Sequence, residues 1–143
     1  AAVHFNTVGE VGAGLRNTLV TFERARCHMA AWGYGLARRA MEEAIRYSQD
    51  RSQHGKPIAG HQLIADKLAV MATEIDAARL LLYRACAYKD AGRPFGPEAA
   101  MAKLFVSETS ERIADLTLQL CAGRGYEQER SLRDRGEIPE HAR

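Results

Sequence analysis

The sequence predicts an all-α protein arranged as an up-and-down antiparallel four-helix bundle. Apolar residues recur at alternating steps of three and four positions through most of the chain, which is the period of a helix with one buried face. Short stretches with proline or glycine separate these long segments, so consecutive helices are expected to fold back on one another. A strand signal is almost absent beyond a short stretch at 3–5.

Two helices are expected in the first third of the chain, a short one from about 12 to 22 and a long one from about 26 to 50. The buried face of the long helix is predicted to consist of Met29, Gly33, Leu36, Ala40 and Ala44. An ion pair between Glu42 and Arg46 is expected on its outer face. Because glycine inside a helix costs about 1 kcal/mol relative to alanine, the two glycines of the WGYG segment indicate close approach by another backbone.

The next two helices have the clearest periodicity. One is predicted over about 59 to 91, after Pro57 and before Gly92. Its apolar stripe consists of Ile64, Leu68, Met71, Ile75, Ala78 and Leu82. The other begins near Pro97, which suits a first helical turn, and ends before Gly123. Its stripe consists of Ala102, Val106, Thr109, Ile113, Leu116 and Leu120.

Charge and composition exclude several classes of partner. The 143 residues suffice for one domain with a sizeable core, and 20 Lys and Arg against 18 Asp and Glu leave a net charge of +2. Neither sign forms a long block, so nothing indicates nucleic acid or an anionic membrane as a partner. The longest apolar runs are far shorter than the roughly 18 residues that span a bilayer, so membrane insertion is not expected.

Cysteines, histidines and glycines form no recognisable metal or phosphate motif. The three cysteines, Cys27, Cys86 and Cys121, lack zinc-ligand spacing, so we interpret them as small buried residues of a protein from a reducing compartment. The five histidines are not spaced as ligand pairs in carboxylate-rich helices, so no metal site is expected. The glycines of GEVGAG and GRGY lack the strand, turn and helix order of a phosphate-binding loop.

The join at 47–62, YSQDRSQHGKPIAGHQ, carries more hydrogen-bonding side chains than a helix connection requires. They include Arg51, Ser52, Gln53, His54, Lys56, His61 and Gln62. One interpretation is a solvated turn. Another is anion binding, because arginine presents a planar fork of donors and the following helix presents its N-terminal amides and the positive end of its dipole. The residue types alone leave both interpretations open.

Five segments carry a family resemblance. They are NTVGEVGAG at 6–14, GLARRAMEEAIRYSQDRSQHGKPIAGHQ at 35–62, AVMATEIDAARLL at 69–81, EAAMAKLFVSE at 98–108 and QLCAGRGYE at 119–127. In this order and spacing they resemble the C-terminal helical domain of the acyl-CoA dehydrogenases. The resemblance implies FAD as cofactor, acyl-CoA as substrate and an electron-transferring flavoprotein as electron acceptor. It also implies a homodimer or homotetramer, in the cytoplasm of a bacterium or in the mitochondrial matrix.

The resemblance also implies which residues contact the cofactor. In the family, the join between the two helices reads R-x-x-F-G-x-x-x-x-x-x-Q and reaches the FAD of a neighbouring subunit, with its arginine directed at the pyrophosphate. Segment QLCAG is similar to the family's Q-x-x-G-G, which approaches the adenine end of the same cofactor. His54 stands where the family usually has phenylalanine, and Ala122 replaces the first glycine. The implied cofactor-binding residues are Arg51, Gln53, His54, Gln62, Gln119 and Gly123.

A carboxylate must remove the α-proton of the thioester, and the family places it at one of two positions. One directly precedes an arginine that lies beside this carboxylate; that arginine matches Arg26, and the preceding residue is Ala25, which cannot accept a proton. The other position is a Y/F-E-G segment near the C-terminus. The base is therefore expected beyond Arg143, with Arg26 supporting it.

These matches give an expected domain organisation. Residues 1–11 would end a preceding β-domain or linker, and residues 12–143 would form the C-terminal helical bundle, truncated before the Y/F-E-G segment. Because the chain has no initiator Met, we expect it to be part of a longer protein and to be catalytically silent alone. The alternatives are an acyl-CoA oxidase or a relative of the same fold without dehydrogenase activity, and a plain helical interaction module.

Overall fold

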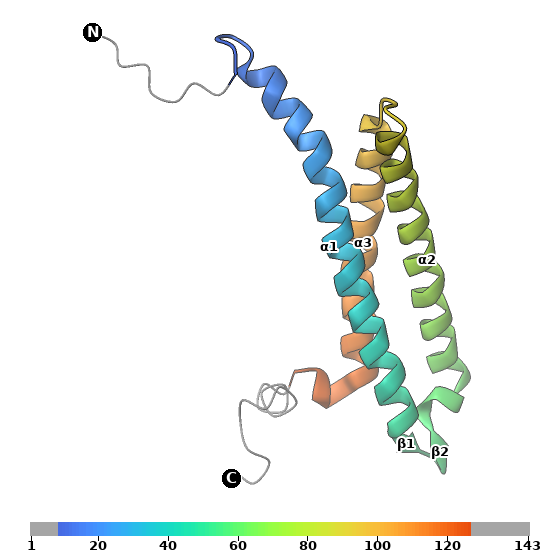
Figure 1. Cartoon of the computed structure of the whole chain (residues 1–143). Coiled ribbons are helices and arrows are strands. Elements are labelled where there is room, and N and C mark those ends of the chain that lie inside the picture. Colours follow the sequence, from blue (N-terminus) through green and yellow to red (C-terminus); the bar gives the residue numbers. More distant parts are fainter. Residues whose placement is uncertain (1–8, 127–143) are drawn as a thin grey trace.

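Three long helices dominate the computed structural model of the chain, which describes residues 9–126 (Figure 1). Consecutive helices run antiparallel, and α1 makes its most extensive contacts with α3. A small two-stranded sheet lies in the join between α1 and α2, and a short 3₁₀ turn follows α3. In chain order the elements are α1 (Gly14–Asp50), β1 (Ser52–Gln53), β2 (Lys56–Pro57), η1 (Ile58–Gly60), α2 (Gln62–Asp90), α3 (Gly96–Cys121) and η2 (Ala122–Gly125).

The predicted all-α class is confirmed, but the predicted four-helix count is wrong for the described residues. The segments 12–22 and 26–50 form one continuous helix, α1, instead of two. Its backbone continues because the residues between the two segments are Glu23, Arg24 and Ala25, which favour helix and include no glycine or proline. The strand signal at 3–5 lies outside the described residues.

Helices α2 and α3 bury the faces that their periodicity predicts. Every residue of the two predicted stripes is buried or half-buried, with Met71, Val106 and Ile113 almost fully enclosed. Pro97 lies in the first turn of α3, where its missing backbone N–H leaves no hydrogen bond unmade. The prediction for these two helices is therefore confirmed in both extent and orientation.

The predicted buried face of α1 is partly wrong. Met29 and Leu36 are 55% and 69% exposed, although Ala44 is buried as expected. The face that packs on the bundle is shifted from the predicted one by about one position along the sequence, so Ala30 and Ala37 are buried in place of Met29 and Leu36. This face consists of smaller side chains: Cys27, Ala30, Ala37, Ala44 and Ser48. Small residues let the helix backbones approach closely, so α1 packs mainly through these residues. Met29 and Leu36 point outward, whereas the larger Tyr34 and Met41 pack partly against the core.

Of the two glycines in the WGYG segment, Gly33 permits a close approach. A Cβ added at Gly33 would lie 3.0 Å from Val106 Cγ1 and 3.7 Å from the Val106 carbonyl oxygen, both on α3. A Cβ added at Gly35 would meet no atom of the described residues within 4 Å. The expectation of backbone contact is therefore confirmed for Gly33 and wrong for Gly35.

The core consists of two clusters stacked along the bundle. One lies toward the α2–α3 turn and includes Cys27, Ala30, Leu82, Ala85, Ala99 and Val106. The other lies toward the β1–β2 hairpin and includes Ala37, Ala44, Met71, Ile75, Ile113 and Leu120. Both clusters draw on all three helices. Because α1 and α2 are antiparallel, Ala30 and Leu82 share one level of the bundle, and Ala37 and Ile75 share the other.

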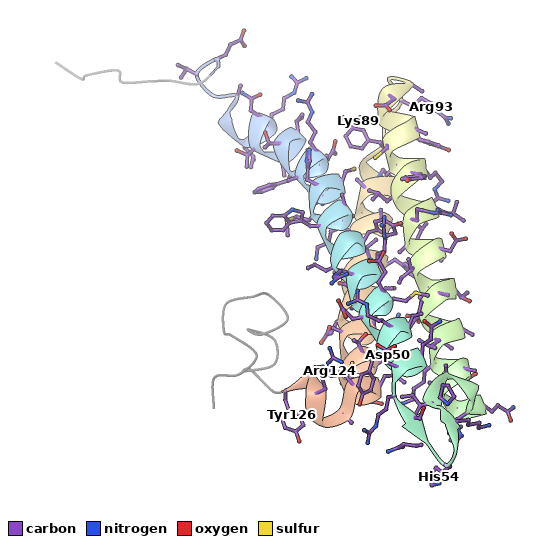
Figure 2. All side chains as sticks on the ribbon, turned by 60° about the horizontal axis from the view of Figure 1, so that its bottom comes forward. Asp50, His54, Lys89, Arg93, Arg124 and Tyr126 are labelled. Atoms are coloured by element: carbon purple, nitrogen blue, oxygen red, sulfur yellow. The ribbon has the colours of Figure 1, made fainter. Side chains whose placement is uncertain are left out.

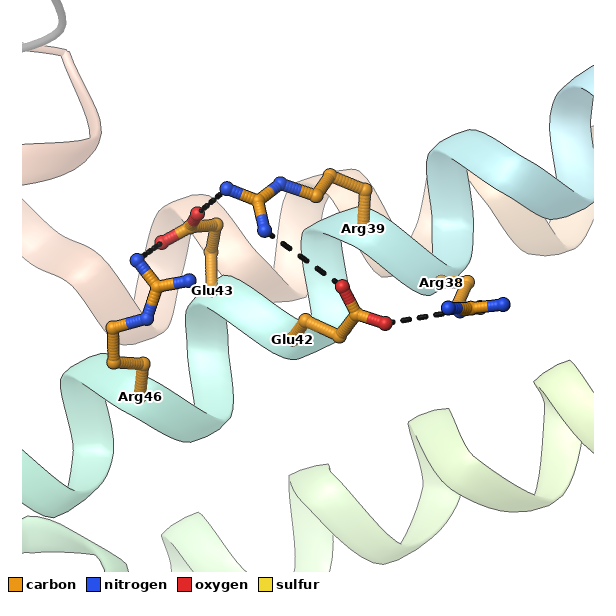
Figure 3. A network of polar contacts seen from close by, with 5 residues as sticks. All are labelled: Arg38, Arg39, Glu42, Glu43 and Arg46. Carbon is orange, nitrogen blue, oxygen red and sulfur yellow. Dashed lines mark hydrogen bonds and ion pairs between the residues drawn. The ribbon is translucent and has the colours of Figure 1, made fainter. Parts of the chain in front are cut away.

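A ladder of charges covers the outer face of α1 (Figure 3). Glu42 accepts a hydrogen bond from Arg38 Nε at 2.9 Å and pairs with Arg39, while Glu43 pairs with Arg39 and Arg46. The predicted pair of Glu42 with Arg46 does not form, because each side chain reaches another partner one helical turn away. The Arg38 hydrogen bond lowers the pKa of Glu42, but the ladder is solvent-exposed and contributes little stability.

The two WGYG glycines allow a matched test of the α1–α3 contact. We expect Gly35→Ala to raise the free energy of unfolding by about 1 kcal/mol, because alanine favours helix and the new methyl group meets open space. Gly33→Ala should be clearly less stable than Gly35→Ala, because its methyl group would press on Val106. Chemical denaturation of both variants measures the difference. Equal stabilisation by both substitutions would contradict a tight α1–α3 contact.

Candidate functional site

The join between α1 and α2 is a tight β-hairpin. Ser52 pairs with Pro57 and Gln53 pairs with Lys56 in antiparallel register, so the turn contains only two residues. These residues, His54 and Gly55, have φ values of +54° and +81°. A two-residue turn with both residues in the left-handed region matches the twist of the flanking strands. This turn places His54 at the tip of the hairpin, at one end of the molecule (Figure 2).

Several polar side chains of the join hold the hairpin itself. Lys56 Nζ donates a hydrogen bond to the Gly60 carbonyl oxygen at 2.8 Å, and a ring nitrogen of His61, Nε2, lies 3.2 Å from the Gln53 carbonyl oxygen. The Ile58 amide donates to the Arg51 carbonyl oxygen at 2.8 Å, and the Ile58 side chain is buried. Some of the hydrogen-bonding side chains in the join therefore serve as partners for backbone carbonyl groups of a tightly bent segment.

The end of α3 lies beside this hairpin and has an unusual backbone. Ala122, which follows the last residue of α3, has φ +47° and ψ −128°. Residues other than glycine rarely adopt this conformation, because the Cβ atom crowds the neighbouring backbone. The amide of Ala122 nevertheless donates to the Gln119 carbonyl oxygen, which closes the helix end. Two of the residues that follow this bend, Gly123 and Arg124, line a hollow together with Arg51 and Gln53 of the join.

Two adjoining hollows separate the hairpin from the end of α3. The first has a volume of about 420 Å³ and is lined by Tyr47, Asp50, Arg51, Gln53, Gly123 and Arg124. The second, of about 410 Å³, is lined by Gln53, His54, His61, Ile64, Lys67 and Gln119. Gln53, Ile58, Leu120 and Ala122 border both hollows. Residues from 51–54 and from 119–124, far apart in the sequence, therefore meet at one end of the bundle.

Most of the residues that the sequence implicates in cofactor binding are brought together here. Arg51 and Gly123 line the first hollow, His54 and Gln119 line the second, and Gln53 lines both. Gln62, the first residue of α2, is exposed and borders neither hollow.

Arg26 belongs to a different part of the molecule. It is exposed on α1, about 37 Å along the helix from Arg51 at a rise of about 1.5 Å per residue. Within the described residues, the arginine implied for the active site therefore lies far from the residues implied for the cofactor.

Reasoning from the sequence missed Lys67, Arg124 and Tyr47. Lys67 Nζ donates to Gln119 Oε1 at 2.9 Å, and the Arg124 guanidinium lies 5.7 Å from the centre of the Tyr47 ring. The Gln119 amide nitrogen donates in turn to Asp115 Oδ2 at 2.8 Å, so this glutamine is held from two helices. No local pattern could have found Lys67, because its partner Gln119 is remote in sequence and only the packing of α2 on α3 joins them.

The charge around the hollows suits an extended anionic ligand. Arg51 and Arg124 line the first hollow with Asp50, and Lys67 lines the second with two histidines. Within residues 9–126, the exposed Arg51 guanidinium makes no hydrogen bond or ion pair. A free planar fork of donors beside a second arginine matches the geometry of phosphate oxygens. The arrangement therefore fits a ligand with a diphosphate better than a neutral one.

Two other kinds of site find no support in the described part of the chain. Between residues 9 and 126, no group of three or more His, Cys, Asp or Glu side chains is placed to hold a metal ion. None of the helices in the same range combines the length and the apolar character needed to cross a membrane.

Comparison with known proteins matches most of the chain to one family. The family described as acyl-CoA dehydrogenase, C-terminal domain, matches residues 12–136. Among curated proteins, the chain is 41% identical over 133 residues to the probable acyl-CoA dehydrogenase YngJ of Bacillus subtilis, covering 90% of this chain and 35% of that protein. It is 40% identical over 121 residues to the caffeyl-CoA reductase–Etf complex subunit CarC of Acetobacterium woodii, covering 85% and 32%.

Solved structures agree with the sequence matches. Butyryl-CoA dehydrogenase from Megasphaera elsdenii superimposes with a TM-score of 0.83 and 39% identity, covering 85% of this chain and 32% of that one. PigA, solved with FAD and proline, superimposes with a TM-score of 0.83 and 29% identity, covering 88% and 33%. The chain spans about a third of the length of the proteins that it matches.

The backbone of Ala122 gives a prediction for this end of the molecule. We expect Ala122→Gly to raise the free energy of unfolding by about 1 kcal/mol, because glycine adopts the positive φ without steric strain. Ala91, at the end of α2, has a φ of −77°, so Ala91→Gly should bring no stabilisation and serves as the control. Thermal denaturation of both variants checks this. An Ala122→Gly protein that is less stable than the parent would contradict the strain.

Proposed function

The chain belongs to the acyl-CoA dehydrogenase family, and from this premise we propose that the full-length protein is an FAD-dependent acyl-CoA dehydrogenase, with residues 12–143 in its C-terminal helical domain. Its reaction would convert an acyl-CoA thioester into the trans-2-enoyl-CoA. Bound FAD would accept the β-hydrogen as hydride while a carboxylate removes the α-proton. Residues 9–126 would bind the cofactor and support the site, and the carboxylate would come from outside them.

The observation that carries the proposal is the meeting of the hairpin with the end of α3. Arg51 and Gln53 from the join, and Gln119 and Gly123 from α3 and η2, surround two adjoining hollows. We propose that the Arg51 guanidinium binds the diphosphate of FAD held by an adjoining subunit, since the structure gives it no competing partner among residues 9–126. PigA, a chain of the same fold, was solved with FAD, which supports this choice of cofactor.

The remaining residues of the proposed cofactor site contribute in different ways. Gln119, held by Lys67 and Asp115, would contact the adenine end in a fixed orientation. Gly123 lines the hollow without a side chain and so leaves room for a ligand. His54 would contact the cofactor from the hairpin tip, and Gln62 from the first turn of α2, where the free amides of the helix start favour an anion.

The second apolar face of α1 supports an assembly of subunits. Leu15, Phe22, Met29 and Leu36 recur every seven residues, and each is more than half exposed. Such a stripe along a helix is typical of a surface that another element covers. We propose that this face is buried in a homodimer or homotetramer, or against the rest of the full-length protein.

The proposal also includes a role for Arg26, an electron acceptor and a location in the cell. Arg26 is exposed on α1, as a residue that supports a carboxylate from another part of the protein should be. The electron acceptor would be an electron-transferring flavoprotein, since the similar CarC protein is named as a subunit of an Etf complex. Relatives from a bacterium and from bovine mitochondria support a proposed location in the bacterial cytoplasm or the mitochondrial matrix.

The role of Arg51 can be tested in the full-length holoprotein. We expect Arg51→Ala to weaken FAD binding by about 10-fold to 100-fold, because a charge-assisted contact worth about 1.5–3 kcal/mol is lost. Equilibrium dialysis of the reconstituted apoprotein measures the dissociation constant.

Arg93→Ala is the matched control for this experiment. Arg93 lies at the opposite end of the bundle, stacked 4.0 Å from the Tyr88 ring centre, so its loss should leave FAD binding unchanged (Figure 2). Equal dissociation constants for the parent and for Arg51→Ala would refute the proposed contact with the diphosphate.

A further inference from the structure

Two cysteines from different helices lie in the same core cluster. Cys27 on α1 is 8% exposed and belongs to the cluster near the α2–α3 turn, and half-buried Cys86 on α2 packs against that cluster. Both are free thiols. The buried Cys121 lies at the other end of the bundle, as the last residue of α3. The expectation of small buried residues therefore holds for Cys27 and Cys121, whereas Cys86 is partly accessible.

The antiparallel arrangement puts Cys27 and Cys86 at the same level. Measured from the hairpin end, Cys27 lies about 35 Å along α1 and Cys86 about 36 Å along α2, at a rise of about 1.5 Å per residue. Ala30 and Ala85, one on each helix beside these cysteines, are almost fully buried in the same cluster. Their small side chains allow the two helices to lie close together, as a bond between facing cysteines requires.

Burial and the neighbouring groups make the Cys27 thiol a poor first nucleophile. Burial raises the pKa of the Cys27 thiol, the nearby Cys86 thiol raises it further, and the Lys89 ammonium opposes this rise in pKa. Lys89 lies one helical turn beyond Cys86 on α2, so both groups face Cys27 from the same side. A buried thiol with a raised pKa remains protonated at neutral pH and is a poor first nucleophile. The more accessible Cys86 is therefore the residue that meets an oxidant first.

We propose that Cys27 and Cys86 form a redox-sensitive dithiol that closes into a disulfide between α1 and α2, with hydrogen peroxide as the oxidant. The Cys86 thiolate attacks one peroxide oxygen and the O–O bond breaks, which leaves a sulfenic acid on Cys86 and releases one water after protonation. The Cys27 sulfur then attacks the Cys86 sulfur. The S–O bond breaks, the Cys27 proton leaves with the hydroxide as a second water, and the S–S bond forms.

The crosslink would act on the part of α1 that carries Arg26. Arg26 directly precedes Cys27, and the first turns of α1 lean away from the other helices (Figure 1). In residues 14–22 every side chain is exposed, so few contacts hold this end of α1 in place. A covalent bond at Cys27 would tie this end of the helix to α2. The inference concerns the thiols alone and does not rest on the proposed dehydrogenase activity.

Peptide mapping of the full-length protein tests the proposal. The reduced protein is treated with hydrogen peroxide, the remaining thiols are alkylated, and a non-reducing digest is analysed by mass spectrometry. We expect the number of free thiols to fall by two per chain, a peptide pair linking Cys27 to Cys86 to appear, and dithiothreitol to reverse both changes. An unlinked Cys27 after oxidation of Cys86 to a stable sulfenic acid would overturn the proposal.

Three serine variants separate the roles of the cysteines. Cys86→Ser should abolish the linked peptide and leave Cys27 unmodified. Cys27→Ser should leave a sulfenic acid on Cys86 that dimedone labels. Cys121→Ser is the control, because Cys121 lies at the other end of the bundle, as the last residue of α3. This variant should form the Cys27–Cys86 crosslink to the same extent as the parent. A crosslink that involves Cys121, or one that persists in Cys86→Ser, would refute the assignment.

Discussion

The close packing of small residues of α1 against α3 is the constraint on which the rest of the structure depends. Ala30, Ala37 and Ala44 are buried, and Gly33 lies directly against Val106, so the two helices approach closely at these positions. Larger apolar residues of α1 such as Leu15, Phe22 and Leu36 consequently lie on its outer surface. One helix therefore has two apolar faces, a narrow one that forms this core and a wide one that is available to another partner.

The same packing aligns the two polar segments at one end of the bundle. Because α1 and α3 lie along each other, the hairpin after α1 and the end of α3 face each other across two adjoining hollows. The polar residues of the hairpin then divide into two groups. Lys56 and His61 satisfy backbone carbonyls of the bent segment, whereas Arg51 and Gln53 line the space beside α3. Of the two interpretations of the join, a solvated turn and an anion site, neither is excluded: some of its polar residues hold the turn, and others line the hollow beside α3.

Helix α1 connects two regions with different chemistry. Its C-terminal end leads into the hairpin and the proposed cofactor contacts, and its N-terminal half carries Arg26 and Cys27. A continuous helix of 37 residues fixes the spacing between these regions, since a helix changes length only by breaking hydrogen bonds. Two residues that differ from the family pattern, Ala122 and His54, lie at the end of the bundle that carries the hairpin. Ala122 has a backbone that favours glycine, and His54 is held in the left-handed region by the hairpin turn.

The sequence by itself determined the class of the fold, the position of α2 and α3, the face that each buries, and the segments that make up the candidate site. The first three features depend on local signals, namely proline and glycine at the ends and a single apolar stripe on each helix, whereas the segments of the candidate site were indicated by the resemblance to a family. Only the tertiary structure decided which face of α1 is buried, because α1 has apolar residues on two sides and the choice depends on how closely α3 can approach. It also decided that Lys67 holds Gln119 and that Arg38 replaces Arg46 beside Glu42. Contacts of these kinds depend on distances between side chains that no pattern along the chain specifies.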